Sequence, residues 1–312
     1  MIASRTEITR DAVASHYDEL DHFYRDVWGD HVHHGLWSRG DETREEAVLQ
    51  LTEMVVRAAR LTEGRASACP VQTTRSTEDV PKEETMGSTE DVQKHVPPRI
   101  CDIGCGYGAT AHLLAARGAD VTGITISPAQ FTVANSSPAG NNPRFVCGDW
   151  LQNDFAAESF DAAIAIESSE HMPELSAFFQ QAARVLKPGG RLVVCAWLSA
   201  DQPSRNAIRW LLEPICREGR MPQLAASGEY QSLAAAAGFR SERFEDITRG
   251  VKRTWPVIVR RLLVKFATAP RFLRFLFTPH AQNRIFALTI LRIWVAYHTG
   301  AMRYGVFTFV KR

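Results

Sequence analysis

The sequence lacks several features that mark common protein classes. Its six cysteines include no C-x-x-C pair and several fall on predicted strands, which indicates reduced core residues. The N-terminus has no basic segment followed by an apolar one, so no secretory signal is predicted. The most apolar late run, 288–297, is interrupted by Arg292 and is too short to span a bilayer. These absences predict a cytoplasmic protein.

Net charge is also nearly absent, because 36 Lys and Arg residues face 35 Asp and Glu residues. This balance argues against nucleic acid as a partner. The average hides a segment without acidic residues, 247–312, in which basic residues alternate with Leu, Ile, Phe and Trp. Three partners suit such a segment: an anionic membrane contacted peripherally, an apolar or acidic substrate, or the acidic N-terminal region of the same chain.

Large apolar residues are almost missing from 66–98, which repeats Ser-Thr-Glu-Asp-Val at 76–80 and 88–92. We expect this low-complexity segment to be a disordered insertion. It separates an N-terminal helical lid, 1–65, from a core over 99–250. A helical cap over 251–303, broken by prolines, precedes a final core strand at 304–312.

The core alternates predicted strands and helices. Strands are expected at 99–103, 120–125, 143–148, 160–166 and 190–197, and helices at 109–117, 128–134 and 174–186. Such alternation predicts an α/β fold with a parallel sheet covered by helices on both faces. Two further segments, 239–247 and 305–311, alternate as strands do.

A glycine-rich loop, Asp102–Gly108, joins the first strand to the first helix of this core. Glycines let a ligand approach the backbone closely, and the helix that follows offers unpaired N–H groups, so a nucleotide-like cofactor is predicted. Gly104, Gly106 and Ala109 also fit the dinucleotide-binding fingerprint. Asp102 before the first glycine, together with Gly108, resembles motif I of class I S-adenosylmethionine-dependent methyltransferases.

The end of the second strand argues against a nicotinamide cofactor. NAD-binding folds place an acidic residue there, whereas this chain offers the hydroxyl and amide groups of Thr125, Ser127 and Gln130. An NAD-dependent oxidoreductase remains one alternative function. A non-catalytic protein that binds S-adenosylmethionine is the other.

Three further segments resemble small-molecule methyltransferases related to γ-tocopherol methyltransferase and the cyclopropane fatty-acid synthases. The first is G-I-T-x-S-P-x-Q at 123–130. The second, Gly148-Asp149-Trp150, resembles the acidic adenine contact of that superfamily, with Trp150 able to stack on the base, although Asp149 also suits an ordinary turn. The third is E-S-x-E-H-M at 167–172, which implies Glu167 on the cofactor side.

Candidate proton acceptors lie in the third segment and in the lid. Glu170 and His171 can accept a proton from a substrate or orient it, while a helix cap and a structural histidine are the alternatives. The H-H-G-x-W sequence at 33–37 resembles the lid of the same group and implies a substrate pocket. The implied pocket residues are Tyr17, His33, His34 and Trp37, with His33 a third candidate base. No metal is expected, because these histidines lack cysteine or carboxylate partners at ligand spacing.

The resemblance implies a doubly wound, mostly parallel, seven-stranded Rossmann-like sheet with an antiparallel last strand and a helical cap. It further implies methyl transfer from S-adenosylmethionine to carbon, nitrogen or oxygen of an apolar small molecule, such as a prenylated quinol or phenol, a lipid or a secondary metabolite. The lid and cap would roof the acceptor. Aromatic residues of the cap suit either that pocket or plain helix packing: Trp255, Phe266, Phe272, Phe275, Phe277, Trp294 and Tyr297.

Overall fold

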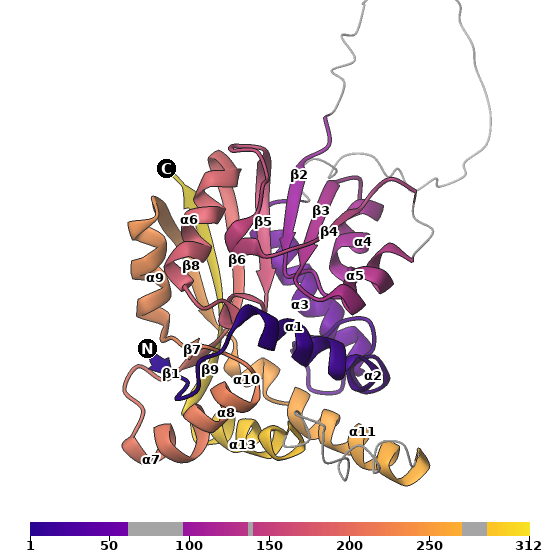
Figure 1. Ribbon diagram of the computed structural model, residues 1–312, viewed down its shortest axis with the longest axis vertical. Coiled ribbons are helices and arrows are strands. Elements are labelled where there is room, and N and C mark those ends of the chain that lie inside the picture. Colours follow the sequence, from indigo (N-terminus) through magenta and orange to yellow (C-terminus); the bar gives the residue numbers. More distant parts are fainter. Residues whose placement is uncertain (62–95, 137–139, 270–285) are drawn as a thin grey trace, which may run out of the picture.

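The computed structural model describes residues 1–61, 96–136, 140–269 and 286–312. A seven-stranded sheet forms its centre (Figure 1). The strands of this sheet are β2 (Arg99–Ile103), β3 (Asp120–Thr125), β4 (Arg144–Cys147), β5 (Phe160–Ile166), β6 (Leu186–Ser199), β8 (Phe239–Asp246) and β9 (Met302–Lys311). A separate two-stranded sheet pairs β1 (Ile2–Ala3) with β7 (Gln223–Leu224).

The strand order is β4-β3-β2-β5-β6-β9-β8. Neighbouring strands from β4 to β6 pair in parallel, whereas β9 runs antiparallel to both β6 and β8. Trp197, near the carboxyl end of β6, therefore stands opposite Tyr304, near the start of β9. The predicted fold class, including the antiparallel last strand, is confirmed.

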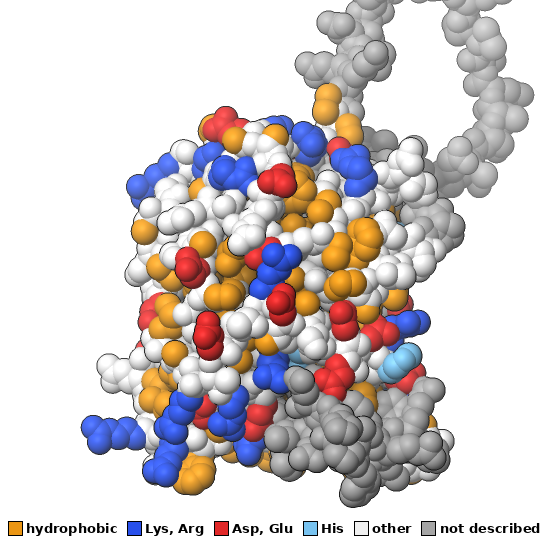
Figure 2. Space-filling view, in the orientation of Figure 1, with side chains coloured by type: hydrophobic (Ala, Val, Ile, Leu, Met, Phe, Trp, Pro, Cys, Tyr) orange, Lys and Arg blue, Asp and Glu red, His pale blue; other side chains and the backbone are white. Residues whose placement is uncertain are grey.

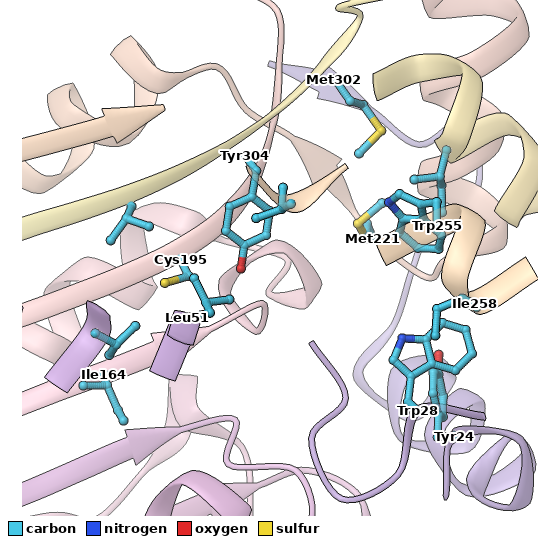
Figure 3. Packing of buried hydrophobic residues seen from close by; sticks show 14 of the residues in the cluster. Tyr24, Trp28, Leu51, Ile164, Cys195, Met221, Trp255, Ile258, Met302 and Tyr304 are labelled. Atoms are coloured by element: carbon cyan, nitrogen blue, oxygen red, sulfur yellow. The ribbon is translucent and has the colours of Figure 1, made fainter. Parts of the chain in front are cut away.

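Alternation along the strands fills two hydrophobic cores, one on each face of the sheet. On β5, Ala162 and Ile164 face one core, and Ala163 and Ala165 face the other. The first core also holds helices α3 (Arg44–Ala58) and α4 (Ala109–Ala116), and Figure 3 shows part of it, including Ile164. Helices α6 (Leu175–Val185) and α9 (Ser227–Ala236) cover the second core.

The N-terminal segment lies across the carboxyl ends of the central strands, where Figure 1 shows α1 (Arg10–Glu19). Thr9 caps α1 by accepting a hydrogen bond from the N–H of Ala12, and Thr43 forms a capping box with Glu46 at the start of α3. Helix α2 (Asp21–Phe23) and a π-helix, η1 (Tyr24–Trp28), follow α1.

Further helices complete the end of the molecule near α1. They are α5 (Pro128–Asn135), α7 (Arg205–Ala207), η4 (Ile208–Leu212), α8 (Glu213–Glu218), α10 (Thr248–Val251), α11 (Thr254–Thr268) and α13 (Phe286–His298), with short 3-10 turns at η2 (Trp150–Gln152) and η3 (Ser169–His171). None of the helices within the described ranges is long and apolar enough to cross a membrane.

The expected strands and helices of the core agree with the observed ones, apart from β6, which begins at Leu186 rather than at residue 190. Most of the expected insertion 66–98, and cap residues 270–285, lie outside the described residues. The cysteine prediction needs a correction: Cys147, the last residue of β4, is exposed and Cys105, in the loop after β2, is half-buried, while Cys101, Cys195 and Cys216 are buried. All five thiols are free.

Two basic side chains of the C-terminal segment 247–312 form ion pairs within the chain. Arg261 lies 3.3 Å from Glu45, and Lys265 lies 3.8 Å from Asp26. Both acids belong to the N-terminal region, so the third interpretation of the basic segment, pairing within the chain, holds for these two side chains.

Candidate functional site

A large cavity of about 490 Å³ opens at the carboxyl ends of β2, β3, β4 and β5. This is the edge at which doubly wound sheets bind ligands, and the volume suits a small organic molecule. The cavity wall includes most of the residues that the sequence singled out: Tyr17, His33, Asp102, Gly104, Gly106, Thr125, Gln130, Asp149, Trp150, Glu167 and His171.

The glycine loop shapes the floor of this large cavity. Gly104, Gly106 and Gly108 have φ angles of 73°, 55° and 81°, a region that side chains other than glycine rarely adopt. A Cβ on Gly104 would clash with the Ser168 side chain, whereas the first atom that a Cβ on Gly106 would meet is Gln130 Nε2, at 4.0 Å. Space above Gly106 is therefore open for a ligand that lies against the backbone.

Asp102 presents an unused acceptor at the same floor. Its side chain is buried, and Oδ2 has no hydrogen-bond partner among the described residues. Burial raises the pKa of Asp102 to about 7. A buried acceptor without a partner is costly, so this carboxylate fits a ligand that brings an N–H donor, such as an amino group.

The ends of β3 and β4 supply further polar atoms. Thr125 donates a hydrogen bond to Gln130 Oε1 at 2.8 Å, which leaves the Gln130 amide N–H groups for the cavity. Asp149 Oδ1 accepts from the N–H of Leu151 at 2.9 Å. Trp150 lines the wall but is only 3% exposed and donates through Nε1 to the Phe178 carbonyl, so most of its ring packs into the core. Its stacking on a base stays a prediction.

Three expected site residues do not line the large cavity. Ser127 caps α5 and donates to Asp18 on α1, because a serine before Pro128 suits a helix N-cap. Gly108 has to be a glycine for packing, since its Cβ would lie 2.6 Å from the Phe145 ring. Trp37, expected in the substrate pocket, is buried and donates to the Glu42 carbonyl. The structure therefore does not bring these three residues to the cavity wall, and a direct ligand contact by them stays a prediction.

Glu167 joins the lid to the sheet. Its Oε1 accepts hydrogen bonds from His34 N at 2.7 Å, His34 Nδ1 at 2.9 Å and the Tyr304 hydroxyl at 2.7 Å, and its Oε2 accepts from Trp197 Nε1 at 2.8 Å. Burial disfavours the charged form, but His34 outweighs it, by its charge whenever the ring is protonated and by its two hydrogen bonds in either form, and lowers the pKa of Glu167 to about 2. Glu167 is therefore a permanent carboxylate.

Glu170, three residues later, has the opposite character. Burial raises its pKa to about 8, although the N–H of Trp197 donates to its Oε1 at 2.6 Å. At neutral pH its carboxyl group is protonated, so it has little capacity to accept a proton. Ser169 also donates to its Oε2, at 3.2 Å.

His171 has a defined tautomer. Its Nδ1 lies 3.2 Å from the Arg220 carbonyl, which can only accept, so Nδ1 carries the hydrogen. The lone pair of Nε2 then accepts from the Tyr17 hydroxyl at 2.9 Å. Burial lowers the pKa of His171 and keeps the ring neutral, with a basic nitrogen directed at Tyr17.

The lid histidines serve different partners. His33 Nδ1 donates to the His34 carbonyl at 2.8 Å, while its Nε2 lies 3.2 Å from His31 Nδ1. Burial lowers the pKa of His33. Thus His33 lines the large cavity as a neutral ring whose second nitrogen already faces a neighbour.

A second, inner cavity of about 60 Å³ lies behind the large one. Four residues line both cavities: Tyr17, Val32, Glu167 and His171. His34 and Glu170 line only the inner one. Of the cap aromatics, Trp255 lines the inner cavity, Tyr297 is buried near the His34 ring, Phe266 is half-buried and Trp294 is 39% exposed. Phe272, Phe275 and Phe277 lie outside the described residues.

Trp197 and Tyr304 are site residues that sequence reasoning did not find. Both bind Glu167, and the register of the sheet sets them opposite each other. The carboxyl end of β6 and the start of an antiparallel last strand meet at the edge where parallel strands end. The rule that ligand sites form at the carboxyl ends of parallel strands could therefore have predicted both residues.

Comparisons with known proteins agree with this geometry. Residues 101–194 match a family model described as a methyltransferase domain. Tocopherol O-methyltransferase, chloroplastic, from Arabidopsis thaliana is 27% identical over 99% of this chain and 84% of the relative. O-methyltransferase resE from Aspergillus sclerotiorum is 34% identical over 56% of this chain and 70% of the relative.

Solved structures share the fold. The mycolic acid cyclopropane synthase CmaA1, complexed with SAH and CTAB, has a TM-score of 0.75 at 18% identity and covers 99% of this chain and 100% of that one. The [4+2]-cyclase SpnF has a TM-score of 0.73 at 22% identity, with 100% and 99% covered. The relatives named as methyltransferases favour methyl transfer over the oxidoreductase and the non-catalytic alternatives, and the floor of Asp102, Gly104 and Gly106 fits an amino-bearing nucleoside. The chain belongs to the S-adenosylmethionine-dependent methyltransferases, enzymes that use S-adenosylmethionine as cofactor.

Proposed function

We propose that this enzyme methylates a ring oxygen or ring carbon of an apolar small molecule of the prenylated quinol or phenol class. One observation carries the proposal: the large cavity and the inner aromatic cavity meet at the Tyr17–His171 hydrogen bond. The glycine-floored side suits the cofactor, with Asp102, Gln130 and Asp149 as its polar contacts. The inner side suits the acceptor.

Bound S-adenosylmethionine supplies an electrophilic methyl group on a sulfonium. The chain has to hold the acceptor in line with that methyl, exclude water and take up the proton that the acceptor loses. We assign the proton to His171 Nε2 by way of Tyr17: the Tyr17 hydroxyl passes its hydrogen to Nε2 and takes the proton of the acceptor in its place. Glu170 is protonated at neutral pH, and His33 Nε2 faces His31, so both are weaker candidates.

Names of relatives support the substrate class. Besides the plant enzyme named for tocopherol, a Synechocystis relative that is 29% identical over 77% of this chain is named 2-methyl-6-phytyl-1,4-hydroquinone methyltransferase. Both names describe a ring with hydroxyl groups and a long apolar chain. The aromatic lining around Tyr17 and Trp255 suits such a ring.

A radiolabelled methyl-transfer assay over a panel of quinols, phenols and fatty acids tests the proposal. We expect label in a quinol or phenol, and a loss of kcat of about 100-fold or more in His171→Gln. His22→Gln, at an exposed position of the same region, is the matched control and should keep full activity. Transfer to fatty acids alone, or a His171→Gln enzyme with unchanged kcat, would contradict the proposal.

We also propose peripheral contact with anionic membranes, which would bring the enzyme to apolar acceptors. Exposed Leu263 and Val264 on α11 and Leu291 and Trp294 on α13 lie in the segment without acidic residues. Figure 2 shows Lys and Arg side chains gathered at the end of the molecule where Figure 1 places α7, on the same side as α13. Co-sedimentation with vesicles should increase with anionic lipid and fall with salt, and binding that responds to neither would refute the contact.

A cytoplasmic location is part of the same proposal, on the basis of the five free cysteines. The Arabidopsis relative is named as chloroplastic, so the compartment needs its own experiment. Fractionation of cells that produce the full chain should find it in the cytoplasm, and recovery in another compartment would refute that assignment.

A further inference from the structure

The wall of the inner cavity is aromatic and carries polar side-chain atoms that the transfer of a methyl group does not require. The cavity is walled by the lid residue His34, by Trp197 at the end of β6 and by Trp255 of α11, and Met221 closes it after α8. Figure 3 shows Trp255 next to Met221. Its volume of about 60 Å³ has room for a hydroxyl group and the edge of the ring that bears it, since about 10–15 Å³ of such space is enough for a water molecule.

Two polar atoms of this wall lack hydrogen-bond partners within the part of the chain that the structure describes: His34 Nε2 and Trp255 Nε1. The two side chains are 1% and 2% exposed, so neither lies on the outer surface of the protein. Buried polar atoms nearly always have partners, and two on one small cavity indicate a ligand that supplies them.

The two atoms have opposite roles. His34 Nδ1 donates to the Glu167 carboxylate at 2.9 Å, so in the neutral ring Nε2 has a free lone pair and accepts. Trp255 Nε1 can only donate. The rings of His34 and Trp255 meet edge to face with centroids 5.2 Å apart. A hydroxyl group, which donates one hydrogen bond and accepts another, complements this pair.

The charge of the wall selects among ligands. Neither Lys nor Arg is among the described residues that line the inner cavity, and the permanent carboxylate of Glu167 borders it. An anionic group such as a carboxylate or diphosphate would be buried beside a like charge without a counter-ion. A neutral hydroxyl carries no such penalty.

We propose that the inner cavity is an anchoring site for a neutral hydroxyl group on an aromatic ring of the acceptor, which accepts from Trp255 Nε1 and donates to His34 Nε2. The inference rests on the proposed function and specifies which residues hold the phenol or quinol acceptor through a ring hydroxyl. The anchored hydroxyl is a specificity contact. Methylation takes place at another atom of the molecule, beside Tyr17 and His171.

Phenol, anisole, toluene and benzoate are the probes for this site, titrated into the full chain with S-adenosylhomocysteine bound. We expect phenol to bind at least about tenfold more tightly than toluene, because its hydroxyl makes two hydrogen bonds that toluene cannot make, and benzoate not to bind. Anisole, which accepts but cannot donate, should fall between phenol and toluene. Equal affinities for phenol and toluene, or benzoate binding as well as phenol, would overturn the proposal.

Trp255→Phe removes the N–H and keeps an aromatic ring, so the preference for phenol over toluene should drop about threefold or more. Trp210→Phe, at a tryptophan that is 62% exposed, is the control and should keep the preference. In ¹⁵N-indole-labelled wild-type protein, the Trp255 Nε1–H resonance should shift with phenol and not with toluene, a readout that does not depend on a variant folding.

The S-adenosylhomocysteine titration that precedes each probe reports on the proposed function separately. Failure to bind S-adenosylhomocysteine counts against the proposed function. Binding of S-adenosylhomocysteine without any preference for phenol counts against the anchoring site alone.

Discussion

Glu167 offers the sharpest test of how the site is held together. Glu167→Gln replaces a permanent carboxylate that accepts four hydrogen bonds with an amide. The three donors that bind Oε1 can still bind the amide oxygen. The amide NH₂ group then faces the indole N–H of Trp197, and both groups are donors. One buried hydrogen bond is lost and the charge that favoured the others disappears.

The pKa of Glu167 sets the magnitude. A fall of the pKa from its usual value of 4.5 to about 2 corresponds to roughly 3 kcal/mol of stability at about 1.36 kcal/mol per unit. Because the folded-state pKa is lowered, this contribution is complete above pH 4.5 and is lost as the pH falls toward 2. We therefore expect the free energy of unfolding of Glu167→Gln to be about 3 kcal/mol lower than that of wild type at pH 7, and the gap to close on acidification.

Urea unfolding followed by tryptophan fluorescence at several pH values measures this gap. Asp154→Asn makes the same chemical change at an exposed carboxylate and should leave stability within about 0.5 kcal/mol of wild type. A Glu167→Gln protein as stable as wild type at pH 7, or a gap that stays constant down to pH 3, would refute the reasoning.

Three further predictions follow from the same region. Gly106→Ala should weaken S-adenosylhomocysteine binding, measured by calorimetry, about tenfold or more, because the added methyl group enters the open space over the loop. Gly118→Ala is the control, since Gly118 has a φ of 90° and no atom within 4 Å of its Cβ. This variant should carry similar backbone strain and leave the affinity unchanged. Equal losses in both would attribute the effect to strain. Glu170→Gln should gain stability relative to wild type as the pH rises from 4.5 through 8. The raised pKa of Glu170 means that the wild-type protein loses stability over that range. Parallel pH profiles of thermal unfolding for the two proteins would contradict this prediction. Asp102→Asn should bind S-adenosylhomocysteine about tenfold less tightly at pH 8 without a lower Tm, since it removes a buried carboxylate that has no partner among the described residues, and unchanged affinity would exclude Asp102 from the cofactor contacts.

Local pattern was enough to predict most of the core. Strands β3 and β5 coincide with the expected 120–125 and 160–166, because buried parallel strands are short apolar runs bounded by turn residues. The glycine loop and the residues after β5 could be placed on one cavity because parallel strands end at a common edge. Glu167 and His171 accordingly line the large cavity.

Long-range partners could not be predicted in the same way. Ser127 has the hydroxyl group expected of a cofactor contact, but this hydroxyl donates a hydrogen bond to Asp18, 109 residues earlier in the chain. Trp37 matches a lid motif, yet packing beneath the lid turns it toward Glu42. The different pKa values of Glu167 and Glu170 depend on His34 and on burial, and neither is encoded in the spacing of two glutamates.

The position of β9 affects how the enzyme is made. This strand lies between β6 and β8, and it carries Tyr304 to the Glu167 carboxylate. On a ribosome, β8 is synthesised before β9 and has no place in the sheet until residues 302–311 have emerged. The β8 edge therefore stays unpaired from the synthesis of residue 246 until residues 302–311 have emerged, and the Glu167 carboxylate lacks its Tyr304 partner over the same late stage, so the cofactor site is finished only at the end of translation.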